Sequence, residues 1–476
     1  MSSLFTDTSH PNRKWLVLAI VAMTQLVVVL DGTIVAISLP HAQAELHLSD
    51  VQRQWVVTAY ALAFGSLLLL GGRIADFWGR KRTYIVGLAG FGIASAYGGL
   101  IHSGAELIIA RGLQGVFAAL MAPAALAILT ITFPMGRERN TAFAIFGTTA
   151  GMGAAIGFIL GGILTEYASW RWCLLVNVPI VVVAIFAAAL LLTESKAQGD
   201  TKLDIISAVT VTAGLGALVY GFTLAEHGWN QLSVLLYLAG AVVLLTVFVV
   251  RQATYAHPLL PLRILNRTRS GAFLLQMIAG ATMIGAMLYL TFHMQIVLQF
   301  TPLQAGLGMI VQTVAISSTV PFATKLLPKF GPRPYLIIGP IIASVGIFYL
   351  SFVTVGGSYW TQIMPALIIA GIGMALLFVP VQNIALLGVD PHDAGAASAT
   401  GNASNQIGGS IGLAVFTTIY VEASAGSHLP ADLVEGYHAV FRASAVVVLF
   451  GAVIAFLMIR GSKADLMPGI TVKEMH

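Results

Sequence analysis

An acidic residue stands inside the first long apolar run of the chain. This run extends from Trp15 to Pro40 and contains Asp31. A carboxylate in the hydrocarbon of a bilayer costs roughly 2.5–3.5 kcal/mol even on the lower insertion scales. Because burial disfavours the charged form of an acid, Asp31 is a candidate proton carrier. The alternative is a carboxylate that caps or pairs statically and moves no proton.

A basic residue and an amide stand at a comparable depth in another apolar run. Arg111 lies about one and a half helical turns from one end of the run at 106–132, and Asp31 lies about two turns from the end expected on the same side of the membrane. Charges buried in a membrane usually pair. We predict that Arg111 responds to the charge of Asp31, directly or through Gln114 and water. A static buried pair is the alternative.

The whole chain has the composition of a membrane protein. Its 476 residues are 58% hydrophobic and 9% charged, with a mean hydropathy of +0.89, whereas soluble domains carry about 25% charged residues. Apolar stretches long enough to cross ~30 Å of hydrocarbon recur throughout. We predict an all-α membrane protein with fourteen spans, at 15–38, 51–71, 83–101, 106–132, 140–164, 172–193, 204–225, 231–250, 271–298, 303–326, 334–354, 359–380, 394–421 and 437–459.

The basic residues predict which span ends face the cytoplasm. With a cytoplasmic N-terminus, 20 of the 24 Lys and Arg residues fall in cytoplasmic segments, as the positive-inside rule requires. The even number of spans then places both termini in the cytoplasm. The formal net charge of +5 therefore reflects loop topology, and no nucleic-acid partner is expected.

The loop expected between the second and third spans combines glycines, an acid and several bases. It reads GRIADFWGRKR from Gly72 to Arg82. The two glycines allow tight turns and close helix approach, and Asp76 can accept hydrogen bonds at a helix start or pair with an arginine. We predict a conformational latch on the inner face, formed by Gly72, Asp76, Gly79, Arg80 and Lys81. A plain positively charged loop is the alternative.

Four sequence motifs, each in the expected span or loop, resemble those of the major facilitator superfamily. The loop pattern G-x-x-x-D-x-x-G-R-K-R is similar to the family's loop signature. Three further stretches agree: the segment from Leu30 to Pro40, the run Arg111-Gly112-Leu113-Gln114-Gly115, and the glycine run of span five followed by Trp170-Arg171-Trp172 and Asn177-Val178-Pro179. With fourteen spans the chain resembles the drug:proton antiporter branch. Two departures are Phe77, where the family usually has a base, and Phe158, where antiporters usually have proline.

The resemblance implies a fold, a division of the chain and an activity. The fold would be two six-helix bundles with two extra transmembrane helices, and the residues matching Asp31 and Arg111 are implied in proton coupling. A weak internal repeat agrees, because Gly79, Gly87 and Gly157 each have a glycine 252 residues later. The expected segments are a cytoplasmic N-terminus at 1–14, bundles at 15–193 and 271–460, an inserted hairpin at 204–250, a cytoplasmic linker at 251–270 and a tail at 461–476.

Two further groups of residues are candidates for packing and for substrate contact. Gly153, Gly157 and Gly161 follow each other at a spacing of four, which allows close helix packing. The resemblance implies that this packing acts as a hinge or seal between the halves. Polar side chains and a flexible methionine are candidates for contact with substrate, although methionines more often face lipid or the core. The candidates for the substrate cavity are Gln25, Met287, Tyr289, His293, Asn402, Asn405 and Gln406.

The sequence therefore predicts a secondary transporter of the cell membrane and not an enzyme. It would export amphipathic, often cationic drugs by proton antiport, and the alternative is a narrow exporter of one metabolite, peptide or lipid. The sequence has neither a phosphate-binding G-x-x-x-x-G-K-[ST] loop nor metal-ligand spacing, so we expect no cofactor and no metal. The expected partners are small-molecule substrates, protons and lipid. We expect a monomer, and a periplasmic adaptor stays open.

Overall fold

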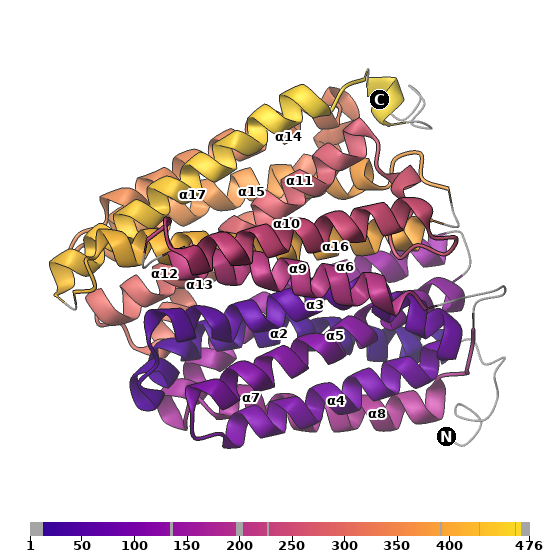
Figure 1. The fold of residues 1–476 in the computed structure, drawn as a ribbon, viewed down its shortest axis with the longest axis horizontal. Coiled ribbons are helices and arrows are strands. Elements are labelled where there is room, and N and C mark those ends of the chain that lie inside the picture. Colours follow the sequence, from indigo (N-terminus) through magenta and orange to yellow (C-terminus); the bar gives the residue numbers. More distant parts are fainter. Residues whose placement is uncertain are drawn as a thin grey trace. The chain divides into compact units, whose positions relative to one another are not determined.

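The computed structural model is helical throughout the part of the chain that it describes (Figure 1). Residues 1–12 of the expected N-terminal segment and 468–476 of the expected tail lie outside the described residues. The described ranges are 13–133, 137–196, 203–225, 228–390, 393–427, 429–461 and 463–467. They divide into two compact units, which are Met1–Thr212 with Tyr255–Leu259 and Ala213–Thr254 with Leu260–His476.

Unit 1 contains the helices of the N-terminal half. They are α2 (Arg13–Leu46), α3 (Asp50–Trp78), α4 (Arg80–Leu100), α5 (Gly104–Thr132), α6 (Arg137–Tyr167), α7 (Trp172–Leu175), α8 (Asn177–Leu191) and the start of α9 (Ile205–Leu224). Within this unit α3 packs along α5 and α2 along α6, while α4 contacts both α5 and α8. Capping boxes at Ser49 and Ser103 satisfy the first N–H groups of α3 and α5.

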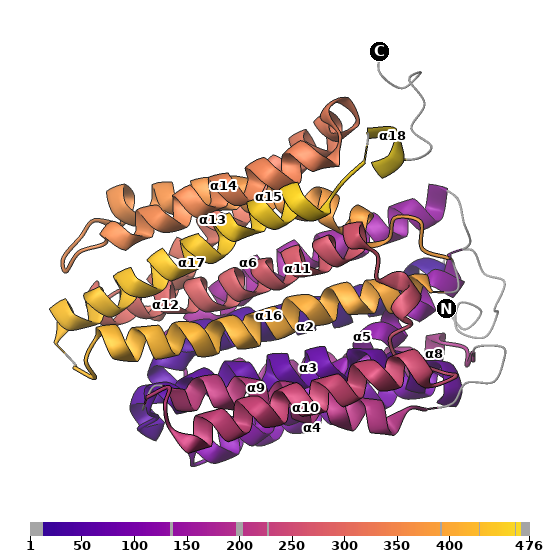
Figure 2. The same cartoon turned by 45° about the horizontal axis from the view of Figure 1, so that its top comes forward.

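Unit 2 holds the rest of α9 and the C-terminal helices (Figure 2). They are α10 (Leu232–Thr254), η2 (Leu262–Ile264), α11 (Arg267–Ala281), η3 (Thr282–Ala286), α12 (Met287–Phe292), η4 (His293–Val297), α13 (Pro302–Phe330), α14 (Pro332–Tyr349), η5 (Leu350–Phe352), η6 (Tyr359–Ile363), α15 (Met364–Ala385), α16 (Ala394–Ala423), α17 (Pro430–Met458) and α18 (Lys463–Leu466). The segments from α11 to η4 form one rod interrupted by π-helical turns at η3 and η4. Such turns often accompany functional sites.

Each of the fourteen predicted spans corresponds to a helical segment, and the all-helical fold class is confirmed. Thirteen of the described helices are long and apolar enough to cross a membrane. The exception, α16, has the length but is rich in glycine, serine and asparagine. Several predicted spans were too short, because the first and last turns of these helices contain polar residues and fall outside the apolar stretch. Span fourteen, for example, was expected from 437 and begins at Pro430.

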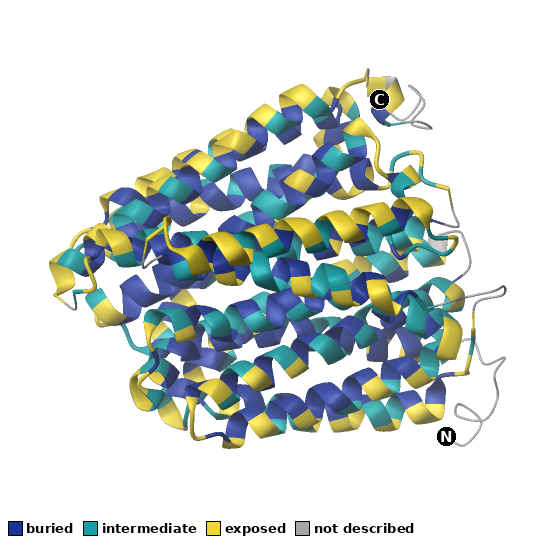
Figure 3. Ribbon diagram, viewed as in Figure 1, coloured by how far each residue is buried: buried dark blue, intermediate teal, exposed yellow. Residues whose placement is uncertain are grey.

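Exposed residues recur along many helices (Figure 3), and many of them have large apolar side chains. Ile93 on α4 is 71% exposed and Phe186 on α8 is 68% exposed. A soluble protein rarely leaves extended apolar faces in water. These faces therefore indicate contact with the hydrocarbon of a membrane.

Equivalent helix contacts in the two units support the internal repeat. A Cβ added at Gly87 on α4 would meet Met121 of α5 at 2.8 Å, and one added at Gly339 on α14 would meet Gly373 of α15 at 2.9 Å. Gly339 and Gly373 stand 252 residues after Gly87 and Met121, respectively. The same offset thus relates both partners of the contact, which chance alignment of glycines would not produce.

Candidate functional site

Asp31 lies on α2 with no exposed surface and holds three polar partners. Arg111 Nη1 of α5 donates to its Oδ2 and forms an ion pair with it. Gln114 Nε2 donates to Oδ1 at 3.0 Å, and Asn177 Nδ2 of α8 donates to the same oxygen at 2.9 Å. A buried carboxylate is costly unless it is paired and hydrogen-bonded, and these three donors satisfy that need.

The helical spacing of α5 explains why two of these partners act together. Arg111 and Gln114 are three residues apart and therefore share one face of the helix. Arg111 Nη1 also donates to Gln114 Oε1 at 2.7 Å, so the amide contacts both charged groups. Gln114 Nε2 further donates to Ser95 Oγ of α4 at 2.7 Å. The Asp31 cluster, meaning Asp31, Arg111, Gln114, Asn177 and Ser95, is thus one connected network.

Two groups of α3 complete the surroundings of the arginine. Arg111 Nε donates to the backbone oxygen of Val56 at 3.3 Å. Its guanidinium carbon lies 4.5 Å from the centre of the Tyr60 ring, which is a favourable cation–π distance. Arg111 is 1% exposed, so these contacts and Asp31, rather than water, stabilise its positive charge. The contact between Asp31 and Arg111 that the sequence predicted is present.

A small cavity lies beside Arg111 within unit 1. Its volume is about 10 Å³, and its lining includes Ser38 and Leu39 of α2, Arg111 and Trp170. A volume of about this size holds about one water molecule. The cavity therefore has room for one water molecule next to the Arg111 guanidinium.

At the end of α2, Glu45 accepts hydrogen bonds from Trp170 Nε1 at 2.7 Å and from Arg171 Nη2 at 2.8 Å.

The loop between α3 and α4 joins three helices of unit 1. Asp76 Oδ1 pairs with Arg80 Nη2 at 3.0 Å, as expected. Gly79 has a φ of 125°, a conformation open mainly to glycine. Lys81 Nζ donates to the backbone oxygens of Ala189 and Leu192 at the end of α8, at 2.8 and 2.7 Å. These ends of α3, α4 and α8 are thus joined by side-chain contacts.

Two expectations about this loop are corrected. The acceptor at the start of α4 is Glu194 rather than Asp76, because Glu194 accepts from the backbone N–H groups of Lys81 at 3.1 Å and Arg82 at 3.2 Å. Gly72 lies within α3, and a Cβ there would meet only Pro123 at an ordinary 3.7 Å. The close approach belongs to the preceding residue, Gly71, whose Cβ would lie 1.9 Å from the oxygen of Ala119.

The three spaced glycines of α6 all face α2, the helix that carries Asp31. A Cβ at Gly153 would lie 3.1 Å from the oxygen of Leu26. At Gly157 it would lie 1.9 Å from Thr33 Oγ1, and at Gly161 it would lie 3.0 Å from Ile34. The predicted close packing is therefore present within unit 1. A role as hinge or seal between the halves stays a prediction.

The expected substrate-cavity residues lie in different surroundings. Met287, Tyr289 and His293 are buried inside unit 2, and Tyr289 Oη donates to Thr417 Oγ1 at 2.8 Å. The His293 ring packs edge-on against Tyr437 at 5.4 Å. Of the other candidates, Asn402 is exposed, Gln25, Asn405 and Gln406 are half-buried, and Asn405 Nδ2 donates to the oxygen of Gln276 at 3.3 Å. Their role in binding stays a prediction.

Sequence reasoning missed several members of the site. Asn177 entered only as part of a motif, although a polar side chain in an apolar run at the depth of Asp31 is a usable signal. Ser95, Gly71 and Glu194 carry no comparable signal. Their roles depend on which faces of α3, α4 and α5 meet, and on where the chain runs after α8.

Comparison with known proteins identifies the family of this chain. Residues 21–413 and 272–470 match the model of the Major Facilitator Superfamily. The chain belongs to the Major Facilitator Superfamily. It is accordingly a transporter and not an enzyme, and a multi-pass protein of the cell membrane. The family predicted from the sequence motifs is confirmed.

Several similar proteins are known by name. The chain is 38% identical over 461 residues to the puromycin resistance protein pur8 of Streptomyces alboniger, covering 94% of this chain and 92% of that protein. It is 38% identical over 456 residues to the cephamycin export protein CmcT of Amycolatopsis lactamdurans, covering 94% and 93%. It is 27% identical over 420 residues to the multidrug efflux pump LfrA of Mycolicibacterium smegmatis, covering 87% and 82%.

Solved structures agree on the fold. A bacterial homolog of the human lysosomal transporter Spinster, in an inward-facing and unoccupied conformation, matches with a TM-score of 0.65 at 16% identity, covering 97% of this chain and 100% of that one. The nucleoside transporter NupG matches with a TM-score of 0.66 at 13% identity, covering 93% and 100%. At such identities the likeness concerns the fold alone.

Proposed function

We propose that this transporter exports small amphipathic compounds, many of them cationic, in exchange for protons, with Asp31 as the group that takes up the proton. The observation that carries the proposal is the buried Asp31 cluster on the first membrane helix. Asp31 is fully buried and contacts one cation and two amides. An ionisable group inside a membrane helix is a candidate for a proton relay.

Protonation of Asp31 would remove the attraction that holds Arg111 to it. The guanidinium would keep its contacts with Gln114 Oε1, the Val56 oxygen and the Tyr60 ring. Arg111 would therefore have supporting contacts in either state of the acid. The small cavity beside it offers a position for one water molecule through which a proton could pass.

The amide of Asn177 can serve both forms of the acid. In the structure its Nδ2 donates to the carboxylate, while its Oδ1 has no hydrogen-bond partner among the described residues. A protonated Asp31 has an O–H that must donate to an acceptor. Rotation of the amide by half a turn would bring Oδ1 to that position. Asn177 would thus stabilise Asp31 before and after proton uptake.

The proton gradient supplies enough free energy to drive export. Each proton that enters contributes ~2.3 kcal/mol per 100 mV of membrane potential and ~1.36 kcal/mol per pH unit. Two bundles that alternate around a site near the membrane midplane would use this energy. The change in charge at Asp31 would select which conformation is favoured.

The relatives support export of toxic compounds and leave its breadth open. LfrA is named a multidrug efflux pump, whereas the names of pur8 and CmcT each mention one compound, puromycin and cephamycin, respectively. The latter two favour the second candidate function, a narrow exporter of one compound. A panel of unrelated toxic compounds in a pump-deficient strain separates the two, because a narrow exporter protects against a single chemical class.

Reconstituted vesicles with an imposed pH gradient test the proposal. Addition of a transported compound should collapse the gradient in vesicles with the wild-type protein. In vesicles with an equal amount of folded Asp31→Asn protein, the gradient should persist. Wild-type export that leaves the gradient unchanged would exclude proton antiport, and an unimpaired variant would exclude Asp31 as the coupling group.

A further inference from the structure

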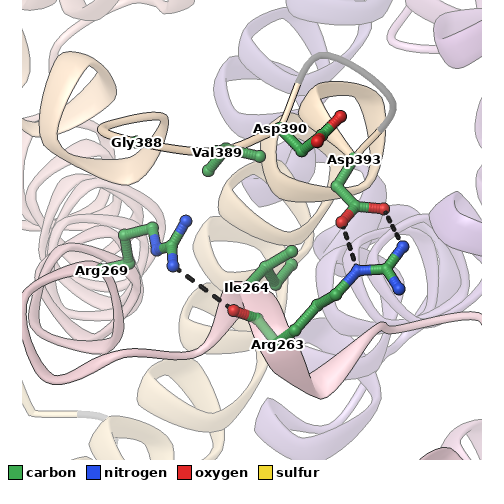
Figure 4. Close-up of a pocket in the computed structure, with 7 residues that line it drawn as sticks. All are labelled: Arg263, Ile264, Arg269, Gly388, Val389, Asp390 and Asp393. Atoms are coloured by element: carbon green, nitrogen blue, oxygen red, sulfur yellow. Dashed lines mark hydrogen bonds and ion pairs between the residues drawn. The ribbon is translucent and has the colours of Figure 1, made fainter.

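A second polar site lies in unit 2 and shares no residue with the Asp31 cluster. It is a cavity of about 500 Å³ between the segment before α11 and the segment joining α15 to α16 (Figure 4). Its charged lining residues are Arg263, Arg269, Asp390 and Asp393. The volume falls within the ~300–1,000 Å³ typical of small-molecule sites. We call it the linker pocket, because Arg263 and Arg269 belong to the predicted linker at 251–270.

Two of these four charges neutralise each other. Arg263 Nε and Nη2 donate to the two carboxylate oxygens of Asp393 at 2.6 and 2.8 Å, which is a bidentate pair. The hydrogen bonds to Asp393, with its charge, raise the pKa of the Arg263 guanidinium. This pair closes one side of the pocket and leaves little charge there for a ligand to balance.

Arg269 lacks such a partner. It is 8% exposed, and its Nη2 makes only a long 3.4 Å hydrogen bond to the backbone oxygen of Arg263. Its Nε has no hydrogen-bond partner, and among the described residues no carboxylate pairs with it. A buried cation without a counter-charge is costly. An anion that binds the Arg269 guanidinium in the pocket would therefore lower the free energy of this buried charge.

The backbone adds to this positive potential. Arg269 lies in the first turn of α11, a helix of 15 residues, and Asn266 caps its start. The N-terminal end of a helix carries a partial positive charge and favours anions. Asp390 lines the same pocket, and its carboxylate disfavours a ligand with two full negative charges. The charges of the four lining side chains cancel, so the unpaired Arg269 guanidinium and the helix start favour no more than a single negative charge.

We propose that the linker pocket binds a phosphate group carrying one negative charge, with Arg269 as its principal ligand. A guanidinium matches two phosphate oxygens at once, in a planar fork that an ammonium group does not offer. The phosphate could belong to a phospholipid headgroup or to a free phosphate ion. An ammonium group on a headgroup would in addition be attracted to Asp390.

Ligand titrations of the purified full-length protein in detergent test this site. The probes are inorganic phosphate, a short-chain phosphatidylglycerol and a short-chain phosphatidylethanolamine, and the readout is the rise in melting temperature. At least one probe should stabilise the wild-type protein with a saturable dose dependence. Absence of stabilisation by all three probes overturns the proposal. Stabilisation by inorganic phosphate indicates the free ion, whereas stabilisation by the lipids alone indicates a headgroup.

A matched pair of variants locates the site. Arg269→Gln should weaken binding of the stabilising ligand ~10-fold or more, because a charge-assisted hydrogen bond is lost. Arg267→Gln removes the same charge two residues away, where Arg267 donates to the oxygen of Leu457 and does not line the pocket, and should leave binding unchanged. Equal binding by Arg269→Gln and the wild type overturns the assignment.

A third variant keeps the test valid if Arg269→Gln does not fold. Asp390→Asn removes a negative charge from the pocket lining while keeping the side-chain volume. It should tighten binding of the stabilising negatively charged probe, inorganic phosphate or phosphatidylglycerol, severalfold, up to ~10-fold. Unchanged or weaker binding of that probe would contradict the proposed position of the phosphate.

Discussion

In unit 1 helix α2, which packs along α6, holds Asp31 in a buried ion pair with Arg111 of α5, whereas in unit 2 the corresponding rod of α11 and η3, which packs along α16, carries amides and a methionine. Both pairs pack through glycines: Gly157 faces Thr33 of α2, and Gly408 faces Met277 of α11. The repeat offset of 252 residues takes Asp31 to Met283 and Arg111 to Ile363. Gln312 Nε2 donates to Met283 Sδ at 3.9 Å, so a neutral amide contacts this position.

This difference separates the backbone frame from the chemistry built on it. Close packing of two helices through small residues recurs in both units, so it belongs to the fold. The buried ion pair of Asp31 and Arg111 belongs to unit 1, whereas the positions 252 residues later hold Met283 and Ile363. We propose that proton coupling resides in unit 1, where this ion pair lies. The predictions below test this asymmetry, from the largest expected effect to the smallest.

Removal of the arginine should be the most damaging change. Arg111→Met leaves a buried carboxylate without its cation, which costs ~3–5 kcal/mol, so both export and the melting temperature should fall. The counterpart change in unit 2, Met283→Leu, conserves volume and should cost less than ~1.5 kcal/mol. Combining Arg111→Met with Asp31→Asn should restore thermal stability without restoring export. A single Arg111→Met variant with full export would contradict the asymmetry.

A methyl group at the glycine contact should affect unit 1 more than unit 2. Gly157→Ala places a Cβ 1.9 Å from Thr33 Oγ1 and 3.0 Å from the Leu30 oxygen, whereas Gly409→Ala meets the mobile tip of Ile284. We expect a loss of ~1–3 kcal/mol at Gly157 from overpacking, measured as a lower melting temperature. Gly147→Ala on the same helix has open space and is the control. Equal losses at Gly147 and Gly157 would refute the packing account.

Loss of the second amide should weaken export more than loss of the serine. Asn177→Leu removes a donor to the Asp31 carboxylate, and a hydrogen bond to a charged group contributes roughly 1.5–3 kcal/mol. Export into vesicles at a fixed pH gradient should therefore fall about 10-fold. Ser95→Ala, which contacts Gln114 and not Asp31, should lower it less. Export by Asn177→Leu at the wild-type rate would contradict this role.

The smallest effect concerns the starts of two equivalent helices. In unit 1 Glu194 accepts from two N–H groups at the start of α4, whereas in unit 2 α14 begins with Pro332, which has no N–H to satisfy. Glu194→Gln should lower stability by ~0.5–2 kcal/mol, the usual range for a lost cap. A melting curve measures it, and no loss would show that solvent replaces the acceptor.

The sequence was sufficient for the helical class, the fourteen segments and the partners of Asp31 on α5. Length and hydropathy identify helices one at a time, and the spacing of Arg111 and Gln114 places both on one face. Asn177, Gly71 and Glu194 lay beyond such reasoning. Each acts through a contact between helices far apart in sequence, and one sequence does not specify which faces meet.

The same limit explains why the close approach was assigned to Gly72, and why the sequence did not show where the expected cavity residues lie. Two adjacent glycines on one helix face different neighbours, and only packing shows that Gly71 makes the close approach. Met287, Tyr289 and His293 were expected to line the substrate cavity. They are buried inside unit 2, where the His293 ring contacts Tyr437, and their role in binding stays a prediction. Burial within a bundle and exposure to a central cavity give the same pattern in an apolar sequence.

Proton release on substrate binding tests the central claim most directly. A transported compound is added to purified protein in weakly buffered detergent solution, and a pH indicator counts the protons released. The account predicts release by the wild-type protein and by Met283→Leu, and none by an Asp31→Asn protein that still binds the compound. Equal proton release by Asp31→Asn and the wild type would contradict the account.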